Sequence, residues 1–353
     1  MKLAAVLGAG VLALLTTAAT PASKVDDARL MDSTPAPTLD AYGLFKDAGG
    51  RAASDGLTPY ALNTALFSDY AEKFRWVHLP PGVKAGWRDT GVLDLPVGAV
   101  LVKTFAYPAD FRAPDKDVKL VETRLLIHRA SGWVPLTYVW NTEGTSAVLK
   151  RAGARLPISF TDAHGAKVSF SYAVPNVNQC KECHQVDGAL QPIGPKARNL
   201  NGDFAYDGGA ENQLAHWTRT GILAGAPSPS SVPVVAHATD EKAPVAERAR
   251  AYLDANCGHC HNARGIANNS GLFLDWEQTD PVARGLGKRP VAAGRASGDL
   301  DYDIAPGQPD KSILVHRMES RDPGVMMPEL GRALVHDEGL KLVREYVKSL
   351  EAK

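Results

Sequence analysis

Hydrophobic positions follow two different patterns in this 353-residue chain, and the pattern changes near residue 174. Before that point, short runs rich in β-branched and aromatic residues are separated by clusters of Gly, Pro and Asp. Such alternation of runs and breaks is typical of strands joined by turns. The runs cover residues 74–79, 100–105, 118–128, 133–140 and 167–174. They predict an all-β domain over residues 41–174.

From residue 175 onward the pattern indicates helices and loops rich in Gly and Pro. Apolar residues recur at helical spacing over residues 245–253 and again over 340–350. A segment rich in Pro and Ser between residues 227 and 244 indicates a linker. We therefore expect two mainly α-helical modules, 175–243 and 244–353. The predicted fold class is α+β and multidomain, with the all-β domain first.

The first residues have the pattern of a secretory signal. Lys2 is followed by a short apolar run over residues 3–15 and then by small residues. The run is shorter than the ~18 residues that indicate a membrane span, although an uncleaved signal-anchor is the alternative. We expect a signal peptide at 1–22, a disordered leader at 23–40 and an exported protein, periplasmic or secreted, with no transmembrane segment in the mature chain.

The composition gives no sign of a nucleic-acid partner. The chain has 39 basic and 39 acidic side chains, so its formal net charge is zero. Nucleic acids and anionic membrane surfaces attract proteins with an excess of positive charge. The hydrophobic share of 44% is that of an ordinary globular protein.

All four cysteines fall into two C-x-x-C pairs, and a histidine follows each pair. The motifs are Cys180-Lys-Glu-Cys183-His184 and Cys257-Gly-His-Cys260-His261. C-x-x-C-H is the attachment signature of c-type haem. The two thiols can bond to the two vinyl groups of haem, and the next residue places an imidazole on the iron. The motifs therefore predict two covalently attached haem c groups. A helix that carries such a motif and crosses a C-terminal helix resembles the layout of a small cytochrome c domain, and this resemblance implies two cytochrome c-like modules.

Two other interpretations of the cysteines are a zinc site and a redox dithiol. The pairs of a zinc ribbon are about 15–20 residues apart, whereas Cys183 and Cys257 are 74 positions apart. A redox dithiol explains neither following histidine. No cysteine is left over for a structural disulfide.

His184 and His261 are the predicted proximal iron ligands. Met327, in the sequence Met326-Met327-Pro328, is the predicted distal ligand of the second iron, because a thioether is a soft ligand that suits haem. Met326 is the fallback. Small cytochrome c domains place such a Met before a Pro, ahead of the last helix, and Met327 is similar in placement.

The distal ligand of the first iron is less defined, because no methionine lies between the two motifs. The candidates are His216 and His237, then Lys196 and His164, and an open position is the remaining possibility. Haem propionates could pair with arginines near the second motif, although solvated charges are the simpler interpretation. These arginines are Arg295, Arg317, Arg321 and Arg332. No role is predicted for His259.

Several stretches together resemble a proteobacterial family of secreted di-haem c-type cytochromes of unknown function. They are residues 60–63, 66–76, 100–105, 137–140, 193–196, 309–312 and 321–324. The resemblance covers nearly the whole mature chain. It implies an N-terminal β domain, two haem c groups, and an exported parallel β-helix protein as a possible partner.

The predicted function is electron transfer in the periplasm, with Fe(II)/Fe(III) cycling at two haems and a redox partner protein. The alternative is a di-haem oxidoreductase, similar to a peroxidase, that uses an open first haem as its substrate site. A third interpretation is a binding module in which the β domain recognises a polysaccharide or an exported protein. The motifs favour an electron carrier over a catalyst.

Overall fold

A computed structural model describes residues 24–291 and 293–351. The predicted signal peptide lies outside these residues. The largest element is an antiparallel six-stranded sheet with the strand order β1-β2-β4-β5-β6-β7. Its strands are β1 (Leu57–Pro59), β2 (Glu72–His78), β4 (Val100–Tyr107), β5 (Lys119–Arg129), β6 (Gly132–Trp140) and β7 (Ala147–Leu149). Its central strands coincide with runs rich in β-branched and aromatic residues, which pack well on a pleated surface.

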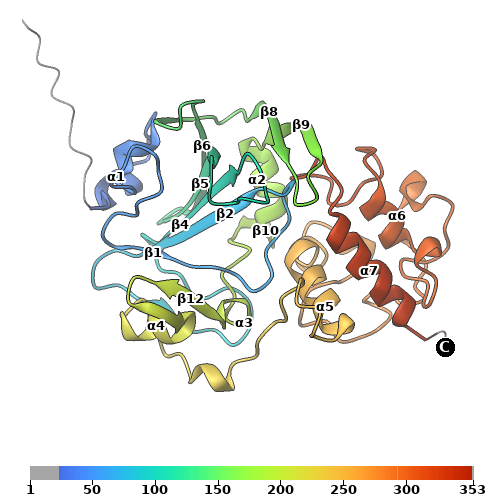
Figure 1. Ribbon diagram of the computed structural model, residues 1–353. Helices are drawn as coiled ribbons and strands as arrows, with labels where there is room; N and C mark the ends of the chain where they lie inside the picture. The colour runs from blue at the N-terminus through green and yellow to red at the C-terminus, as the bar shows by residue number, and fades with distance from the viewer. Residues whose placement is uncertain (1–23, 292, 352–353) are drawn as a thin grey trace, which may run out of the picture.

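Alternation along these strands gives the sheet two covered faces. On β4, Val100 and Val102 point into one core cluster, and Leu101 points into another on the opposite face. The first face is covered by residues 24–45, which include α1 (Asp27–Met31) and the 3-10 helix η1 (Leu39–Tyr42). Figure 1 shows α1 packed against the outer part of the sheet.

The disordered leader predicted for residues 23–40 is wrong for the residues that the structure describes. Leu30 is 1% exposed and Ala36 is fully buried. The backbone N–H of Ala36 donates to the hydroxyl of Tyr42, which also bonds to the hydroxyl of Tyr138 on β6. The leader composition is polar, but a few well-placed apolar side chains are enough to bury it against a sheet face.

The second face of the sheet is covered by residues from both sides of position 174. The hairpin of β8 (Ala154–Thr161) and β9 (Lys167–Val174) packs over one end of this face. Residues 197–232 pack over the other end, where Leu200, Leu214 and Trp217 share a core with the sheet residues Val77 and Leu101. The remaining short elements of this region are β3 (Ala85–Gly86), α2 (Val177–His184), β10 (Gln185–Val186), β11 (Ala189–Leu190), α3 (Ala197–Leu200), β12 (Asp203–Tyr206), β13 (Gly209–Asn212), α4 (Gln213–Arg219), β14 (Leu223–Ala224) and η2 (Pro229–Ser231).

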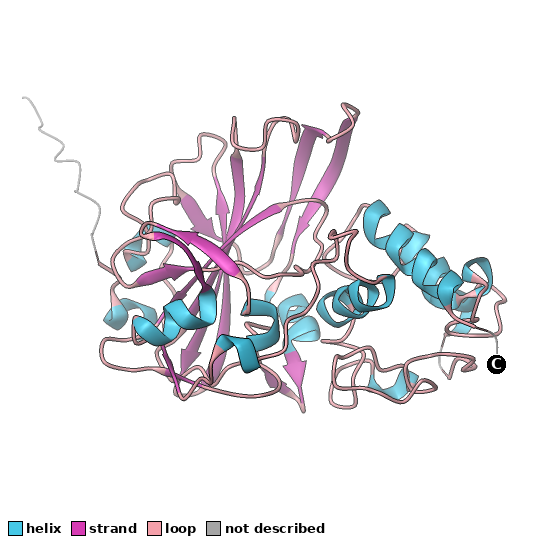
Figure 2. Ribbon diagram, turned by 60° about the horizontal axis from the view of Figure 1, so that its bottom comes forward, coloured by secondary structure: helices cyan, strands magenta, loops and turns pink. Residues whose placement is uncertain are grey.

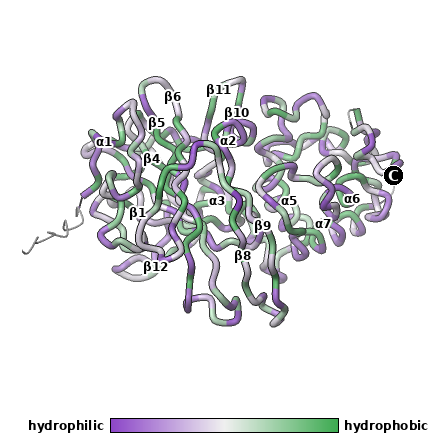
Figure 3. The backbone as a smooth tube through the Cα atoms, turned by 90° about the horizontal axis from the view of Figure 1, so that it is seen from above, coloured by the Kyte–Doolittle hydropathy of each residue, from purple (hydrophilic) through white to green (hydrophobic). Residues whose placement is uncertain are grey.

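Residues 245–350 form a separate core next to the sheet. Helices α5 (Val245–Asn256), α6 (Ile313–Glu319) and α7 (Asp337–Ser349) contribute its apolar side chains, and α5 contacts α7. Long loops with the 3-10 turns η3 (Asn268–Ser270), η4 (Gly294–Ser297) and η5 (Pro309–Lys311) complete it. Figure 2 shows the strands gathered in one half of the molecule and these helices in the other. Figure 3 shows hydrophobic segments inside both halves.

The predicted fold class is wrong in its helical part. The structure is 22% helix and 26% strand, with a large antiparallel sheet and seven α-helices in the described chain, so it does not contain two mainly α-helical, cytochrome c-like modules. The physical reason is that Gly and Pro interrupt the chain after residue 175. The short segments between these breaks bury their apolar residues against the existing sheet. No helix in the described chain is long and apolar enough to cross a membrane.

Candidate functional site

The first C-x-x-C-H motif lies in the last two turns of α2. Asn176 caps this helix: its side chain accepts from the N–H of Gln179 at 2.9 Å, and the Gln179 side chain accepts from the N–H of Asn176 at 3.0 Å. This capping box fixes the start of the helix immediately before the motif. Helical spacing then places Cys180 and Cys183 on one side of the helix, three residues apart.

The second motif continues from the end of α5. Cys257 is the C-cap of this helix, and its carbonyl accepts from the N–H of Cys260 at 3.1 Å and of His261 at 2.9 Å. These two bonds keep the motif in a helical turn although the regular helix has ended. Both motifs therefore form compact helical turns.

Each motif histidine donates one ring N–H to a backbone carbonyl. The Nδ1 atom of His184 lies 2.9 Å from the oxygen of Gln191, and Nδ1 of His261 lies 3.2 Å from the oxygen of Leu272. A carbonyl oxygen only accepts, so the proton is on Nδ1 and the Nε2 atom has its lone pair available. Metal-binding histidines are oriented by this kind of hydrogen bond.

Both imidazoles are in the neutral form that binds iron. Burial lowers the pKa of His184 to about 3, and the charge of Lys103 acts in the same direction. Burial likewise lowers the pKa of His261 to about 4. A neutral imidazole with a free Nε2 is the state required of an axial ligand.

The two motifs meet in space, which the sequence analysis did not predict. One ligand atom from each of Cys183, His259 and Cys260 lies within 4.8 Å of the others. A hydrogen bond from Cys260 lowers the pKa of the Cys183 thiol, against the effect of burial, and a hydrogen bond from His259 lowers it further. His259 was given no role because it lies between the two cysteines of its motif and was expected to point outward.

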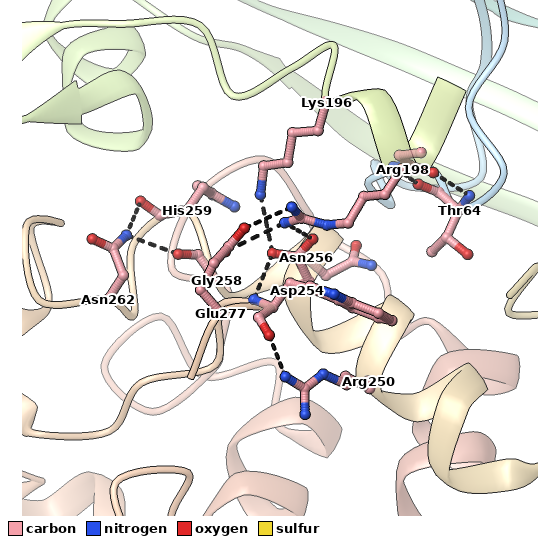
Figure 4. Close-up of polar contacts among 12 residues, drawn as sticks. Thr64, Lys196, Arg198, Arg250, Asp254, Asn256, Gly258, His259, Asn262 and Glu277 are labelled. Atoms are coloured by element: carbon pink, nitrogen blue, oxygen red, sulfur yellow. Dashed lines mark hydrogen bonds and ion pairs between the residues drawn. The ribbon is translucent and has the colours of Figure 1, made fainter. Parts of the chain in front are cut away.

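An ion-paired network holds the second motif in place. The carboxylate of Asp254, one turn before Cys257, accepts from Lys196 at 3.0 Å and from Arg198 at 3.1 Å. Figure 4 shows both cations pointing toward Asp254, and the second carboxylate on Arg198 is Glu277 at 2.7 Å. This network ties α5 to the segment at the start of α3. It also occupies Lys196, which was a candidate iron ligand.

A second contact joins the sheet to the C-terminal loop. The carboxylate of Asp69 accepts from the backbone N–H of Ala333 at 2.6 Å and of Leu334 at 2.7 Å. Asp69 and Tyr70 both have a positive φ, at 49° and 63°, which is uncommon for residues other than glycine. The hydrogen bonds of this contact stabilise that strained turn.

The predicted distal ligand Met327 lies near the second motif. Met327 and Cys257 line one pocket, together with Phe67, Tyr252 and other residues. The loop that carries Met327 is held by Arg332, which is buried and donates to the Met327 carbonyl at 3.1 Å and to the Ser320 carbonyl at 2.9 Å. Arg332 is therefore neither a solvated charge nor free for a propionate.

The other three arginines considered for the propionates differ from Arg332 and from one another. Arg295 is exposed and pairs with Asp322 at 3.1 Å. Arg317 donates to the Val325 carbonyl at 2.8 Å. Arg321 is exposed.

The candidates for the distal ligand of the first iron are not brought to the first motif. His216 lies on α4, where its Nδ1 bonds to Glu211 at 2.8 Å and its ring stacks on Tyr206. Figure 1 shows α4 well separated from α2. His164 is exposed in the β8–β9 turn. Within residues 24–351 as described, neither these two, Lys196 nor His237 makes a hydrogen bond, ion pair or ring contact with Cys180, Cys183 or His184.

The residues fit two haem c groups better than they fit one zinc ion. Cys183, His259 and Cys260 offer three ligand atoms, one fewer than a structural zinc site needs. A zinc ion there would leave Cys180, Cys257 and both oriented histidines unexplained. Haem attachment uses all four thiols and both Nε2 atoms.

A scan against models of protein families found no match to this chain, and searches of curated proteins and of solved structures found none either.

Proposed function

We propose that this protein is an exported cytochrome that binds two haem c groups covalently and transfers electrons. The observation that carries the proposal is the pair of C-x-x-C-H turns in which His184 and His261 each donate Nδ1–H to a backbone carbonyl. Two thiols and one neutral imidazole with a free Nε2 are the protein groups that a haem c requires. When bound, the haems would supply the Fe(II)/Fe(III) couple.

The arrangement of the motifs supports electron transfer between two centres. Cys183 and Cys260 are the second cysteines of their motifs, and their sulfur atoms lie within 4.8 Å of each other. Because the thiols are the attachment points, this contact would hold the edges of two haems close together. The ion pairs of Asp254 and the hydrogen bonds of Asp69 keep the two halves of the protein in this arrangement.

The proposal is tested by producing the full chain in a host that attaches haem c. We expect a protein mass that exceeds the mature polypeptide by two haem groups, two iron atoms per chain, and absorption that survives denaturation because the bonds are covalent. Replacing Cys180 and Cys183 by Ala should remove one haem. A colourless protein with the mass of its polypeptide would refute the proposal.

His259→Ala separates the haem proposal from the zinc interpretation. His259 would be a ligand of a zinc ion at Cys183 and Cys260, but it has no part in haem attachment. The haem proposal predicts two haems in this variant. Zinc in the wild-type protein, lost in His259→Ala, would support the zinc site instead.

A second candidate function is a di-haem oxidoreductase with an open first iron. It is favoured by one observation: none of the distal candidates contacts the first motif in the described chain, whereas Met327 lies in the same pocket as Cys257. Carbon monoxide added to the reduced protein decides between the two. Rapid binding of carbon monoxide to one iron would support the oxidoreductase. The absence of binding would support electron transfer.

The redox partner and the location also remain proposals. A periplasmic site of action rests on the signal-like residues 1–22, and the parallel β-helix partner rests on the family resemblance alone. Co-purification of the holoprotein with periplasmic proteins of its source would test both.

A further inference from the structure

One face of the sheet carries a row of cations where core residues are expected. Arg75 on β2, Lys103 on β4 and Arg124 on β5 lie directly opposite one another across three neighbouring strands. On β4, Leu101 and Phe105 are the neighbours of Lys103 on the same face, and each belongs to a different hydrophobic core. The row therefore separates two cores. Like charges placed directly opposite on a sheet repel each other.

The protein neutralises only part of this charge. Lys73 adds a fourth cation on the same face of β2, and the only buried carboxylate in the group is Glu122, which pairs with Arg124 and accepts from Tyr172. The guanidinium of Arg75 donates to a backbone carbonyl at 3.1 Å. Among residues 24–291 and 293–351, no hydrogen bond or ion pair involves the ammonium group of Lys103. Four cations face one buried carboxylate.

Burial and the neighbouring cations both disfavour the charged form of Lys103. Burial, and then the charges of Arg124 and Arg75, lower the pKa of Lys103 to about 7. Three of the cations also lie over the ring of Phe105, with Lys103 Nζ 5.1 Å and Arg124 Cζ 4.3 Å from its centre. A π-face offsets a small part of the charge repulsion. A bound anion would offset much more.

The row lies next to the first C-x-x-C-H motif. The thiol of Cys180 interacts electrostatically with both Arg124 and Lys103, and His184 interacts with the same two cations. Helix α2, which carries the motif, contacts β6, the strand next to β5, and lies beside it in Figure 1. A haem bonded to Cys180 and Cys183 and ligated by His184 would therefore lie within the electrostatic field of the row.

We propose that Arg75, Lys103 and Arg124, with Lys73, form the site that binds the carboxylates of the haem attached to Cys180 and Cys183. This inference rests on the proposed function. Two propionates per haem would offset most of the excess of three positive charges on this face, and arginine and lysine are the usual partners of carboxylates. The row thereby explains why cations stand between the two cores on this face of the sheet.

The test uses the holoprotein and Lys103→Met, which keeps the apolar length of the side chain and removes its charge. Positive charge near an iron favours the reduced state. We expect the midpoint potential of one haem to fall in Lys103→Met. A fall of about 59 mV corresponds to a tenfold change in the one-electron equilibrium constant. The other midpoint should stay constant. Lys103→Arg keeps a positive charge at this position and should keep the midpoint potential of the wild-type protein. The matched control is Lys119→Met, at an exposed position of the neighbouring strand β5.

The outcomes separate this inference from the proposed function. Absence of covalent haem from the wild-type protein refutes the proposed function itself. If Lys103→Met keeps two haems and both midpoints equal those of Lys119→Met, the inference is wrong. Titration with inorganic phosphate distinguishes the source of the anion. A midpoint that shifts with phosphate in the wild type but not in Lys103→Met would assign the row to a diffusible anion and overturn the haem assignment.

Discussion

Replacing Asp254 by Asn is expected to destabilise the contact between the sheet and the second motif. Asp254 is 4% exposed, and its carboxylate accepts from Lys196 at 3.0 Å, from Arg198 at 3.1 Å and from the N–H of Trp276 at 3.1 Å. The substitution keeps the shape of the side chain but removes its charge. The Lys196 ammonium then has no carboxylate partner in a site where it is only 17% exposed.

The magnitude follows from the cost of a buried cation without its partner. Removing one member of a buried ion pair costs about 3–5 kcal/mol. Arg198 keeps Glu277 at 2.7 Å, which places the expected loss near the lower end, at about 3 kcal/mol. With a urea m-value of about 3 kcal/mol/M, the midpoint of unfolding should fall by about 1 M.

The assay is urea unfolding of the holoprotein followed by circular dichroism. Glu143→Gln, at an exposed turn position, removes the same charge and serves as the control. In the double variant with Lys196→Met the loss should be smaller than the sum of the single losses, because the unpaired cation is gone. If Asp254→Asn unfolds within about 0.5 kcal/mol of the control, the network does not hold the two halves together.

The loss of stability in Asp254→Asn should depend on pH. Burial acts to raise the pKa of Asp254, but the charges and hydrogen bonds of Lys196 and Arg198 outweigh it, so the pKa is lowered. A carboxyl with a lowered pKa in the folded state stabilises the protein above its unfolded pKa of about 3.9, and this stabilisation is lost as the pH falls through the folded value. The difference in stability between wild type and Asp254→Asn should therefore be constant above about pH 5 and shrink below pH 4.

Three further predictions concern single side chains. Met327→Leu should lower the midpoint of one haem and remove the spectral band of Fe(III)–thioether ligation, while Met326→Leu should do neither; equal spectra in both variants would exclude Met327 as a ligand. Asp69→Ala should cost about 2–4 kcal/mol in urea unfolding, because two partly buried backbone amides lose a charged acceptor; a loss under about 0.5 kcal/mol would show that the contact is not needed. Tyr138→Phe should cost about 1–3 kcal/mol, because its hydroxyl donates to the Ala36 carbonyl at 2.9 Å; an unchanged midpoint would mean that the N-terminal segment does not depend on this bond.

The prediction of two helical modules was wrong because a local sequence pattern does not show what a segment packs against. Apolar spacing over residues 245–253 and 340–350 is followed by helices α5 and α7 in the structure. The same reasoning failed for residues 175–243, because their short apolar segments bury themselves on the sheet and need no helical bundle. A segment of about five residues has no periodicity that shows what it will pack against.

The candidate site shows the same division between local and distant information. The residues of each C-x-x-C-H motif are neighbours in sequence, so their chemistry could be predicted from spacing. Lys73 and Arg75 are two residues apart on β2, so the sequence already indicates that their side chains lie on the same face of the strand. Lys103 and Arg124 continue the row only because of how the strands are paired. One sequence does not specify the register of this pairing residue by residue.

The sequence by itself determined the two motifs, the strand-forming runs and the helical spacing of α5 and α7, because each depends on residues a few positions apart. Only the tertiary structure decided that Cys183 meets Cys260 and His259, that Asp254 is held by two distant cations, and that a basic row faces the first motif. These contacts join residues that are tens of positions apart in the chain. Their free energy comes from the burial of whole surfaces, and no local pattern encodes which surfaces meet.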